Sequence, residues 1–240
     1  MNYNELLTYN TDTICQRERE RERVTLIKGD CMDVMQHLDN DFCDLTITDI
    51  PYDGVNKVKE NGLRKLNKGN ADILTFDLYK FLDEIYRITK GTAIIFCNTT
   101  QVSDIANYYY YYMNERKANI SLRQLVWKKT NPSPINGDYT YLSGLENAIW
   151  IKKKGQGVFN AHCKSNVFEY PCGRSKLHPT EKNHKLIADL ILDNSNEGQL
   201  VFDPCMGSGS HGLMAIENNR NFVGIELDPQ YYEVAKSRFN

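Results

Sequence analysis

The feature that most constrains the fold is a regular alternation of short apolar segments with segments of helical periodicity. Apolar runs that predict strands cover residues 24–28, 44–48, 92–97, 122–127, 147–151, 200–203 and 222–226, and helical patterns cover 31–38, 76–89, 101–117, 184–194, 211–218 and 231–239. Strands that alternate with helices predict a mainly parallel sheet covered on both faces. We therefore expect a doubly wound α/β fold, with ligands at the carboxyl ends of the strands.

The composition is that of an ordinary globular chain, because 41% of the 240 residues are hydrophobic and 25% are charged. The longest apolar runs are far too short to cross a bilayer, and the polar start does not resemble a signal peptide, so we expect a cytoplasmic protein. Seven cysteines without a C-x-x-C pair indicate reduced thiols. A zinc site built from His162, Cys163, Cys172 and His178 fits no common ligand spacing, and no metal is expected.

Positive charge is concentrated in two stretches, although the formal net charge is only −2. Twelve Lys or Arg and five Asp or Glu lie between Met113 and Lys182. The second stretch is a long polar segment, 53–70, that carries Lys57, Lys59, Arg64, Lys65 and Lys68. Both would suit a polyanion. The alternating Arg and Glu of 17–23 instead neutralise one another, so residues 1–23 are predicted to be an N-terminal extension of one domain, 24–240.

A glycine-containing turn follows the strand at 200–203. The sequence Asp203-Pro204-Cys205-Met206-Gly207-Ser208-Gly209-Ser210 places two glycines where the backbone can approach a ligand closely, at the start of a helix. The next strand ends at Glu226, a position where an acid commonly bonds ribose hydroxyls. Neither a P-loop nor a G-x-G-x-x-G pattern is present. The alternative is a tight strand-to-helix turn without a ligand.

A second group of polar and aromatic residues, Asp49-Ile50-Pro51-Tyr52, follows the strand at 44–48. Pro51 favours an extended Ile50, which would turn the carbonyl groups of Asp49 and Ile50 outward. A carboxylate, backbone acceptors and a stacking ring together suit a planar base with an exocyclic amine. The alternative is an Asx-Pro turn that only ends a strand.

Together these residues resemble the DNA amino-methyltransferases. Residues 49–52 are similar to the Asp-Pro-Pro-Tyr catalytic motif of that family, and residues 203–210 to its S-adenosylmethionine loop. Leu177-His178-Pro179-Thr180-Glu181-Lys182 resembles the segment that precedes this loop, and Lys28-Gly29-Asp30-Cys31 resembles the Gly-Asp element ahead of the catalytic strand. The catalytic half comes first, as in the β group of the family.

The resemblance covers about residues 24–239 and includes two departures. Ile50 replaces the first proline of the catalytic motif, which leaves the backbone carbonyl in place but removes a source of rigidity. Asn183 replaces the last proline of the His-Pro-Thr segment.

The resemblance implies a Rossmann-like, circularly permuted fold and transfer of a methyl group from S-adenosylmethionine to the N6 amine of a flipped adenine in DNA. It assigns catalysis to Asp49, Ile50, Pro51 and Tyr52. Glu226 would bind the ribose, Asp30 the adenine amine of the cofactor, and His178, Thr180 and Lys182 its methionine end. The full set of cofactor-binding residues would be Asp30, Cys31, Asp49, His178, Thr180, Lys182, Asp203, Pro204, Cys205, Gly207, Ser208, Gly209, Glu226 and Leu227.

Double-stranded DNA is the partner that the resemblance implies. The segment 53–70 is expected to close over the DNA, and a short target-recognition insertion is expected at about 130–176. Trp127 is either a second aromatic platform or a core residue. The residues expected to bind nucleic acid are Lys57, Lys59, Arg64, Lys65, Lys68, Trp127, Lys128, Asn131 and Arg174.

Two alternatives to an adenine enzyme stay open. Cytosine-N4 enzymes of the family usually carry Ser at the position of Asp49, so the acid favours adenine. A DNA-binding module that keeps the fold without catalysis would not require Asp49, Tyr52 or Glu226. A stand-alone enzyme of a phage or prophage is expected, in a bacterial or phage-infected cell. No restriction partner is visible in the chain, and pairing with a second copy stays open.

Overall fold

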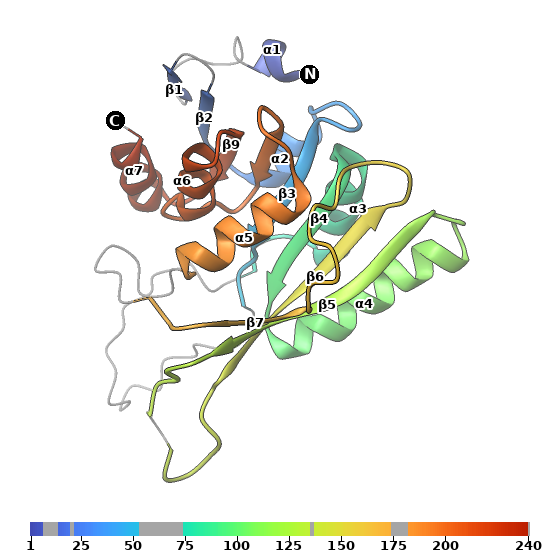
Figure 1. Ribbon diagram of the computed structural model, residues 1–240. Coiled ribbons are helices and arrows are strands. Elements are labelled where there is room, and N and C mark those ends of the chain that lie inside the picture. Colours follow the sequence, from blue (N-terminus) through green and yellow to red (C-terminus); the bar gives the residue numbers. More distant parts are fainter. Residues whose placement is uncertain (7–13, 20–21, 53–73, 135–136, 174–181, 240) are drawn as a thin grey trace.

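The computed structural model describes residues 1–6, 14–19, 22–52, 74–134, 137–173 and 182–239 (Figure 1). Each strand and helix predicted from the sequence is present, with ends that differ by up to three residues. The strands are β1 (Ile14–Arg19), β2 (Glu22–Lys28), β3 (Cys43–Asp49), β4 (Thr89–Cys97), β5 (Ile120–Lys129), β6 (Leu145–Lys153), β7 (Val167–Tyr170), β8 (Leu200–Asp203) and β9 (Asn221–Glu226). The helices are α1 (Tyr3–Leu6), α2 (Cys31–Met35), α3 (Leu78–Ile88), α4 (Thr99–Asn114), α5 (His184–Asn194), α6 (Ser210–Glu217) and α7 (Pro229–Arg238).

The nine strands form one sheet in the order β1-β2-β9-β8-β3-β4-β6-β5-β7. The five strands β2, β9, β8, β3 and β4 are mutually parallel, whereas β6 runs antiparallel to both β4 and β5. The prediction of a mainly parallel sheet is therefore confirmed. The antiparallel direction of β6, the short edge strand β1 and the strand β7 were not predicted.

Two layers of helices cover the sheet because the strand residues alternate between its faces. In β4, for example, Ile94 and Phe96 pack with α5, α6 and α7, whereas Ala93 and Ile95 pack with α2, α3 and α4. Figure 1 shows the two groups of helices on opposite sides of the sheet. Burial on both faces explains the continuous apolar run of β4 from Ala93 to Cys97, and the burial of Thr46 and Thr48 together with Leu45 and Ile47 in β3.

The direction of winding reverses between the neighbouring strands β8 and β3. From β8 the chain passes through α6 to β9 on one side, and from β3 it passes through α3 to β4 on the other. In such sheets the ligand lies at this reversal, beyond the carboxyl ends of the strands. Asp49 and Asp203 are the last residues of these two strands, and Glu226 ends β9.

The last helix and the early strand β2 are neighbours, as a circular permutation predicts. α7 packs beside β2 and β9, and the Tyr232 hydroxyl donates to the Leu26 carbonyl across 3.4 Å. β2 pairs with β9 in parallel, with Lys28 opposite Glu226. The element after Lys28, which begins at Asp30, therefore lies at the same edge of the sheet as Glu226.

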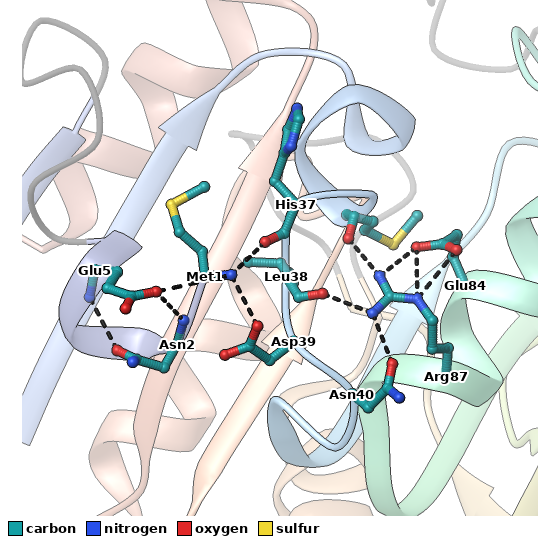
Figure 2. A network of polar contacts seen from close by, with 10 residues as sticks. Met1, Asn2, Glu5, His37, Leu38, Asp39, Asn40, Glu84 and Arg87 are labelled. Carbon is teal, nitrogen blue, oxygen red and sulfur yellow. Dashed lines mark hydrogen bonds and ion pairs between the residues drawn. The ribbon is translucent and has the colours of Figure 1, made fainter.

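Residues before 24 add to the sheet and to the core. β1 pairs antiparallel with β2, and the Leu6 side chain is fully buried. Figure 2 shows how α1 is held against the turn after α2, because the Met1 ammonium donates to the His37 carbonyl at 2.6 Å and to Asp39 at 2.9 Å. Arg87 of α3 donates to two further carbonyl groups of the segment 35–38.

Among the helices of the described residues, none has the length and apolar character that crossing a membrane would require.

Candidate active site

The loop after β3 is anchored by its first two residues, Ile50 and Pro51. Ile50 is 1% exposed and belongs to the core, and its N–H donates to the Phe96 carbonyl of β4 at 3.3 Å. The Pro51 carbonyl accepts a hydrogen bond of 3.0 Å from Gln101, which also forms the capping box at the start of α4. Burial of an isoleucine contributes roughly 1.5–3 kcal/mol. The packing of Ile50 in the core therefore anchors the loop at the position where the Asp-Pro-Pro-Tyr motif has its first proline.

Asp49 binds a buried lysine that lies far away in the sequence. The Lys182 ammonium is 2.6 Å from Asp49 Oδ2 and donates to the Tyr52 hydroxyl at 3.1 Å. Glu146 Oε2 lies 3.0 Å from the same ammonium, outside hydrogen-bond geometry, and Glu146 Oε1 forms an ion pair of 2.7 Å with Lys129. The result is a chain of alternating charges, Lys129–Glu146–Lys182–Asp49, which we call the charge chain.

The charges of this chain sustain one another despite burial. Burial alone would lower the pKa of Lys182, but the negative charges of Asp49 and Glu146 hold that pKa well above its usual value. Burial would likewise raise the pKa of Glu146, and the charges of Lys182 and Lys129 lower it overall. Both side chains are therefore ionised at neutral pH.

Asp49 presents its second oxygen without a partner. Oδ1 is buried and makes no hydrogen bond to any of the described residues. An unpaired buried carboxylate oxygen costs about 1–3 kcal/mol or more, so such an atom calls for an explanation. A ligand that donates a hydrogen bond would satisfy it.

Tyr52 lies next to this carboxylate. Its ring centroid is 5.2 Å from the Lys182 ammonium, and burial and the charge of Asp49 raise the pKa of Tyr52 well above its usual value. The hydroxyl therefore stays protonated. The site thus offers a carboxylate oxygen and an aromatic ring on one short loop.

The glycine turn after β8 and the acid after β9 contact each other. Gly207 has a φ of +54° and donates its N–H to Glu226 Oε2 at 2.8 Å, while Glu226 Oε1 accepts from the Asp228 N–H at 2.7 Å. Gly209 has a φ of +80° and precedes the first residue of α6. Burial raises the pKa of Glu226, although the two backbone N–H groups act in the opposite direction.

Asp203 is used within the protein. It is fully buried, Oδ1 accepts from the Cys205 N–H at 3.0 Å, and Oδ2 lies 2.6 Å from His211 Nδ1. The His211 ring stacks on Phe96 with centroids 6.2 Å apart. Asp203 therefore links the turn to α6, and its predicted contact with a cofactor stays a prediction.

The other predicted cofactor residues lie around the same edge. Asp30 caps α2 by accepting from the Met32 N–H at 2.8 Å, and Cys31 is buried. A hydrogen bond with Cys31, followed by burial, raises the pKa of Cys205 well above its usual value. Pro204 and Ser208 are buried and Leu227 is exposed. His178 and Thr180 lie outside the described residues.

The predicted nucleic-acid residues divide into two groups. Lys57, Lys59, Arg64, Lys65, Lys68 and Arg174 lie outside the described residues. Trp127 is 4% exposed and donates from Nε1 to the Tyr170 carbonyl at 2.8 Å, a position that favours its core alternative. Lys128 is exposed and pairs with Glu169 at 3.1 Å, and Asn131 accepts from the Cys172 N–H at 2.6 Å.

The residues that sequence reasoning missed are Lys129, Glu146, Gln101 and His211.

No cluster of three or more His, Cys, Asp or Glu side chains with the geometry of a metal site occurs in the part of the chain that the structure describes.

Comparisons with known proteins agree with this arrangement. The family described as DNA methylase matches residues 158–237. The type II methyltransferase M.HpaI of Haemophilus parainfluenzae is 29% identical over 90% of this chain and 74% of its own, and M.HinfI of Haemophilus influenzae is 27% identical over 89% and 67%. The crystal structure of the M1.HpyAVI–SAM complex matches with a TM-score of 0.67 and 26% identity, over 90% of this chain and 99% of that one. The PvuII DNA methyltransferase (cytosine-N4-specific) shares the fold, with a TM-score of 0.63, 14% identity, and coverage of 90% and 86%.

The sheet order, the glycine turn beside Glu226 and the acid after β3 define an α/β methyltransferase fold. The sequence and structural matches extend over about nine tenths of the chain. By sequence and by fold, the chain is similar to the DNA amino-methyltransferases.

Proposed function

We propose that this protein transfers a methyl group from S-adenosylmethionine to the exocyclic N6 amine of an adenine in DNA. The observation that carries the proposal is Asp49 Oδ1, a buried oxygen without a partner among the described residues, beside Tyr52. The match to the DNA methylase family and the type II methyltransferase relatives support methylation of DNA. The choice of adenine rests on the acid at position 49, because the cytosine-N4 enzymes of the family usually carry serine there.

The residues at the strand ends fit an adenosine-containing cofactor. Open space adjoins the Cα of Gly207, since a methyl group built there would meet nothing within 4 Å. Glu226, which lies beside it, would accept hydrogen bonds from the two ribose hydroxyls, and Asp30 would face the adenine amine. M1.HpyAVI has been solved with S-adenosylmethionine, which supports the same cofactor here. When bound, it would supply a methyl group on a positively charged sulfur.

The chemistry asked of the protein is to make a poor nucleophile better. The lone pair of an adenine amine is delocalised into the ring. Asp49 Oδ1 and the Ile50 carbonyl would accept its two hydrogens and favour a more tetrahedral nitrogen. As the nitrogen bonds the methyl carbon, the carbon–sulfur bond breaks and its electrons stay on sulfur. The surplus proton then passes from the nitrogen to Asp49 and on to solvent. Positioning and stabilisation of the developing positive charge supply the rate gain.

The base has to leave the duplex to reach this site. Tyr52 would stack on the flipped base. Phosphate contacts are assigned to Lys57, Lys59, Arg64, Lys65, Lys68, Lys128 and Arg174, with Asn131 and the segment 130–176 near the recognised bases.

Expression in a host without DNA methylation tests the proposal directly. One sample of the genomic DNA is digested to nucleosides to identify the methylated base. A second, intact sample is sequenced with a readout of modified bases. We expect N6-methyladenine at one short recognition sequence. N4-methylcytosine would replace the proposal by the cytosine alternative. DNA binding without methylation or cofactor binding would favour a non-catalytic module.

Cofactor affinity is expected to depend on the protonation of Glu226. Its carboxylate accepts ribose hydrogen bonds better than the protonated acid, and burial raises its pKa. The dissociation constant of S-adenosylmethionine should therefore rise as the pH falls from 8 toward about 5. Calorimetric titration across this range measures it, with Glu226→Gln as the control that should bind weakly and without this pH dependence.

The folding stability of the cofactor-free protein is expected to depend on Glu226 in the opposite direction: protonation of Glu226 weakens cofactor binding but favours the folded state. A carboxyl whose pKa is higher in the folded than in the unfolded chain binds more protons when folded, so its contribution to stability grows as the pH falls. A cofactor affinity that stays constant over the whole range would contradict the assignment of Glu226 to the ribose.

A further inference from the structure

The charge chain consists of four charged side chains, whereas the ion pair of Lys182 with Asp49 alone would hold the loop in place. Lys182 is 4% exposed, and its ammonium contacts three oxygens that come from two distant parts of the chain, the segment 49–52 and the start of β6. The ammonium donates hydrogen bonds to Asp49 and to the Tyr52 hydroxyl, and the Glu146 carboxylate forms an ion pair with it at 3.0 Å. The same cation also lies 5.3 Å from the Phe96 ring centroid.

We propose that Lys182 and Glu146 are positioning residues for methyl transfer, with Lys182 fixing Asp49 and Tyr52 and Glu146 neutralising Lys182. This inference rests on the proposed function. Lys182 binds Oδ2 of Asp49 and thereby directs Oδ1, the oxygen without a partner, at the place of the amine. The hydrogen bond to the Tyr52 hydroxyl fixes the ring in relation to that oxygen. One side chain thus sets the distance between acceptor and stacking platform.

Glu146 is needed because a lysine beside Asp49 would otherwise oppose the reaction. The target nitrogen becomes positive during methyl transfer, and a nearby negative charge stabilises it. A lone Lys182 would cancel the charge of Asp49 at that moment. The carboxylate of Glu146, 3.0 Å from the ammonium, offsets Lys182, and Lys129 in turn holds Glu146 at 2.7 Å. The four charges sum to zero, with the negative end at the substrate.

The position of Glu146 in the fold supports this role. β6 runs antiparallel to β4, so the beginning of β6 lies at the carboxyl ends of the parallel strands. Glu146 is the second residue of β6 and pairs in register with Trp127 of β5. The opposite end of the same strand carries Lys153, whose ion pair of 2.9 Å with Asp41 lies at the other edge of the sheet.

Kinetics of Glu146→Gln test the proposal, because the amide keeps the shape and removes the charge. We expect kcat to fall by about 10- to 100-fold. The KM for DNA and the dissociation constant of S-adenosylmethionine should change by less than about threefold, because the interaction matters in the transition state. Glu146→Asp, which keeps the charge, should recover part of kcat. Lys153→Met, which removes the ion pair at the far end of the strand, should leave kcat unchanged.

A double-variant cycle tests whether Glu146 acts through Lys182. Lys182→Met should lower kcat more than Glu146→Gln does, and the double variant should be no slower than Lys182→Met alone. Losses that multiply would overturn the inference, as would a wild-type kcat in Glu146→Gln. If Lys182→Met does not fold, the comparison of Glu146→Gln with Glu146→Asp decides the question. Wild-type protein inactive on all DNA would overturn the proposed function and this inference with it, whereas active wild type with an unchanged Glu146→Gln would overturn the inference alone.

Discussion

Asp49→Asn is expected to lower kcat by about 10²- to 10³-fold or more while S-adenosylmethionine still binds. Lys182 requires an acceptor, so the amide oxygen will take the place of Oδ2. The amide nitrogen must then occupy the place of Oδ1, where a donor would face the hydrogens of the target amine. Radiolabelled methyl transfer and calorimetric titration of the cofactor measure the two properties separately.

Asp44→Asn is the matched control for this variant. Asp44 lies on the same strand, and its Oδ2 accepts from the Leu200 N–H at 3.0 Å, away from the charge chain. It should reduce stability modestly and leave kcat per folded molecule unchanged. Asp49→Asn with near wild-type activity would remove the acid from the mechanism, and loss of folding in that variant would assign Asp49 a structural role instead.

Gly209→Ala is expected to lower the free energy of unfolding by about 2–4 kcal/mol and to weaken cofactor binding. The left-handed backbone costs an alanine about 1–2 kcal/mol. The added methyl group would also lie 3.2 Å from both Ala235 and Phe239, which have to move. That movement shifts the start of α6 and with it the turn that carries Gly207. Chemical denaturation measures the stability.

Gly198→Ala separates these two causes. Gly198 has a φ of +77°, close to the +80° of Gly209, but an added methyl group would meet nothing within 4 Å. It should therefore show only the backbone cost, and cofactor affinity should stay the same. Equal losses of stability in both variants would mean that the contact with α7 is unimportant.

The alternation of strands and helices could be predicted because burial on both faces gives β4, β8 and β9 short runs of mostly apolar residues. The same pattern could not give the direction of β6, since periodicity of apolar residues does not distinguish a parallel from an antiparallel strand. Glu146 was missed for this reason. An acid at the start of a strand can be assigned to the site only when that strand is known to begin at the carboxyl ends of the parallel strands.

Ligands were predicted at the carboxyl ends of the strands, and the sheet brings Asp49, Asp203 and Glu226 together at that edge. Their individual partners could not be predicted. The contact of Lys182 with Asp49 joins residues that are 133 positions apart, and that of Asp203 with His211 depends on how α6 packs on β4. Such contacts arise from tertiary packing, for which one sequence holds no local signal.

The order of the strands has a consequence for how the protein is made. During synthesis on the ribosome, β5 and β6 emerge one shortly after the other and can pair early. β2 emerges near the start, yet its parallel partner β9 lies about two hundred residues later, and β3 likewise waits for β8. Pairings so distant form slowly. During translation the unpaired edges of β2 and β3 are therefore open to aggregation, and a nascent chain interrupted before β8 would lack both the glycine turn and Glu226.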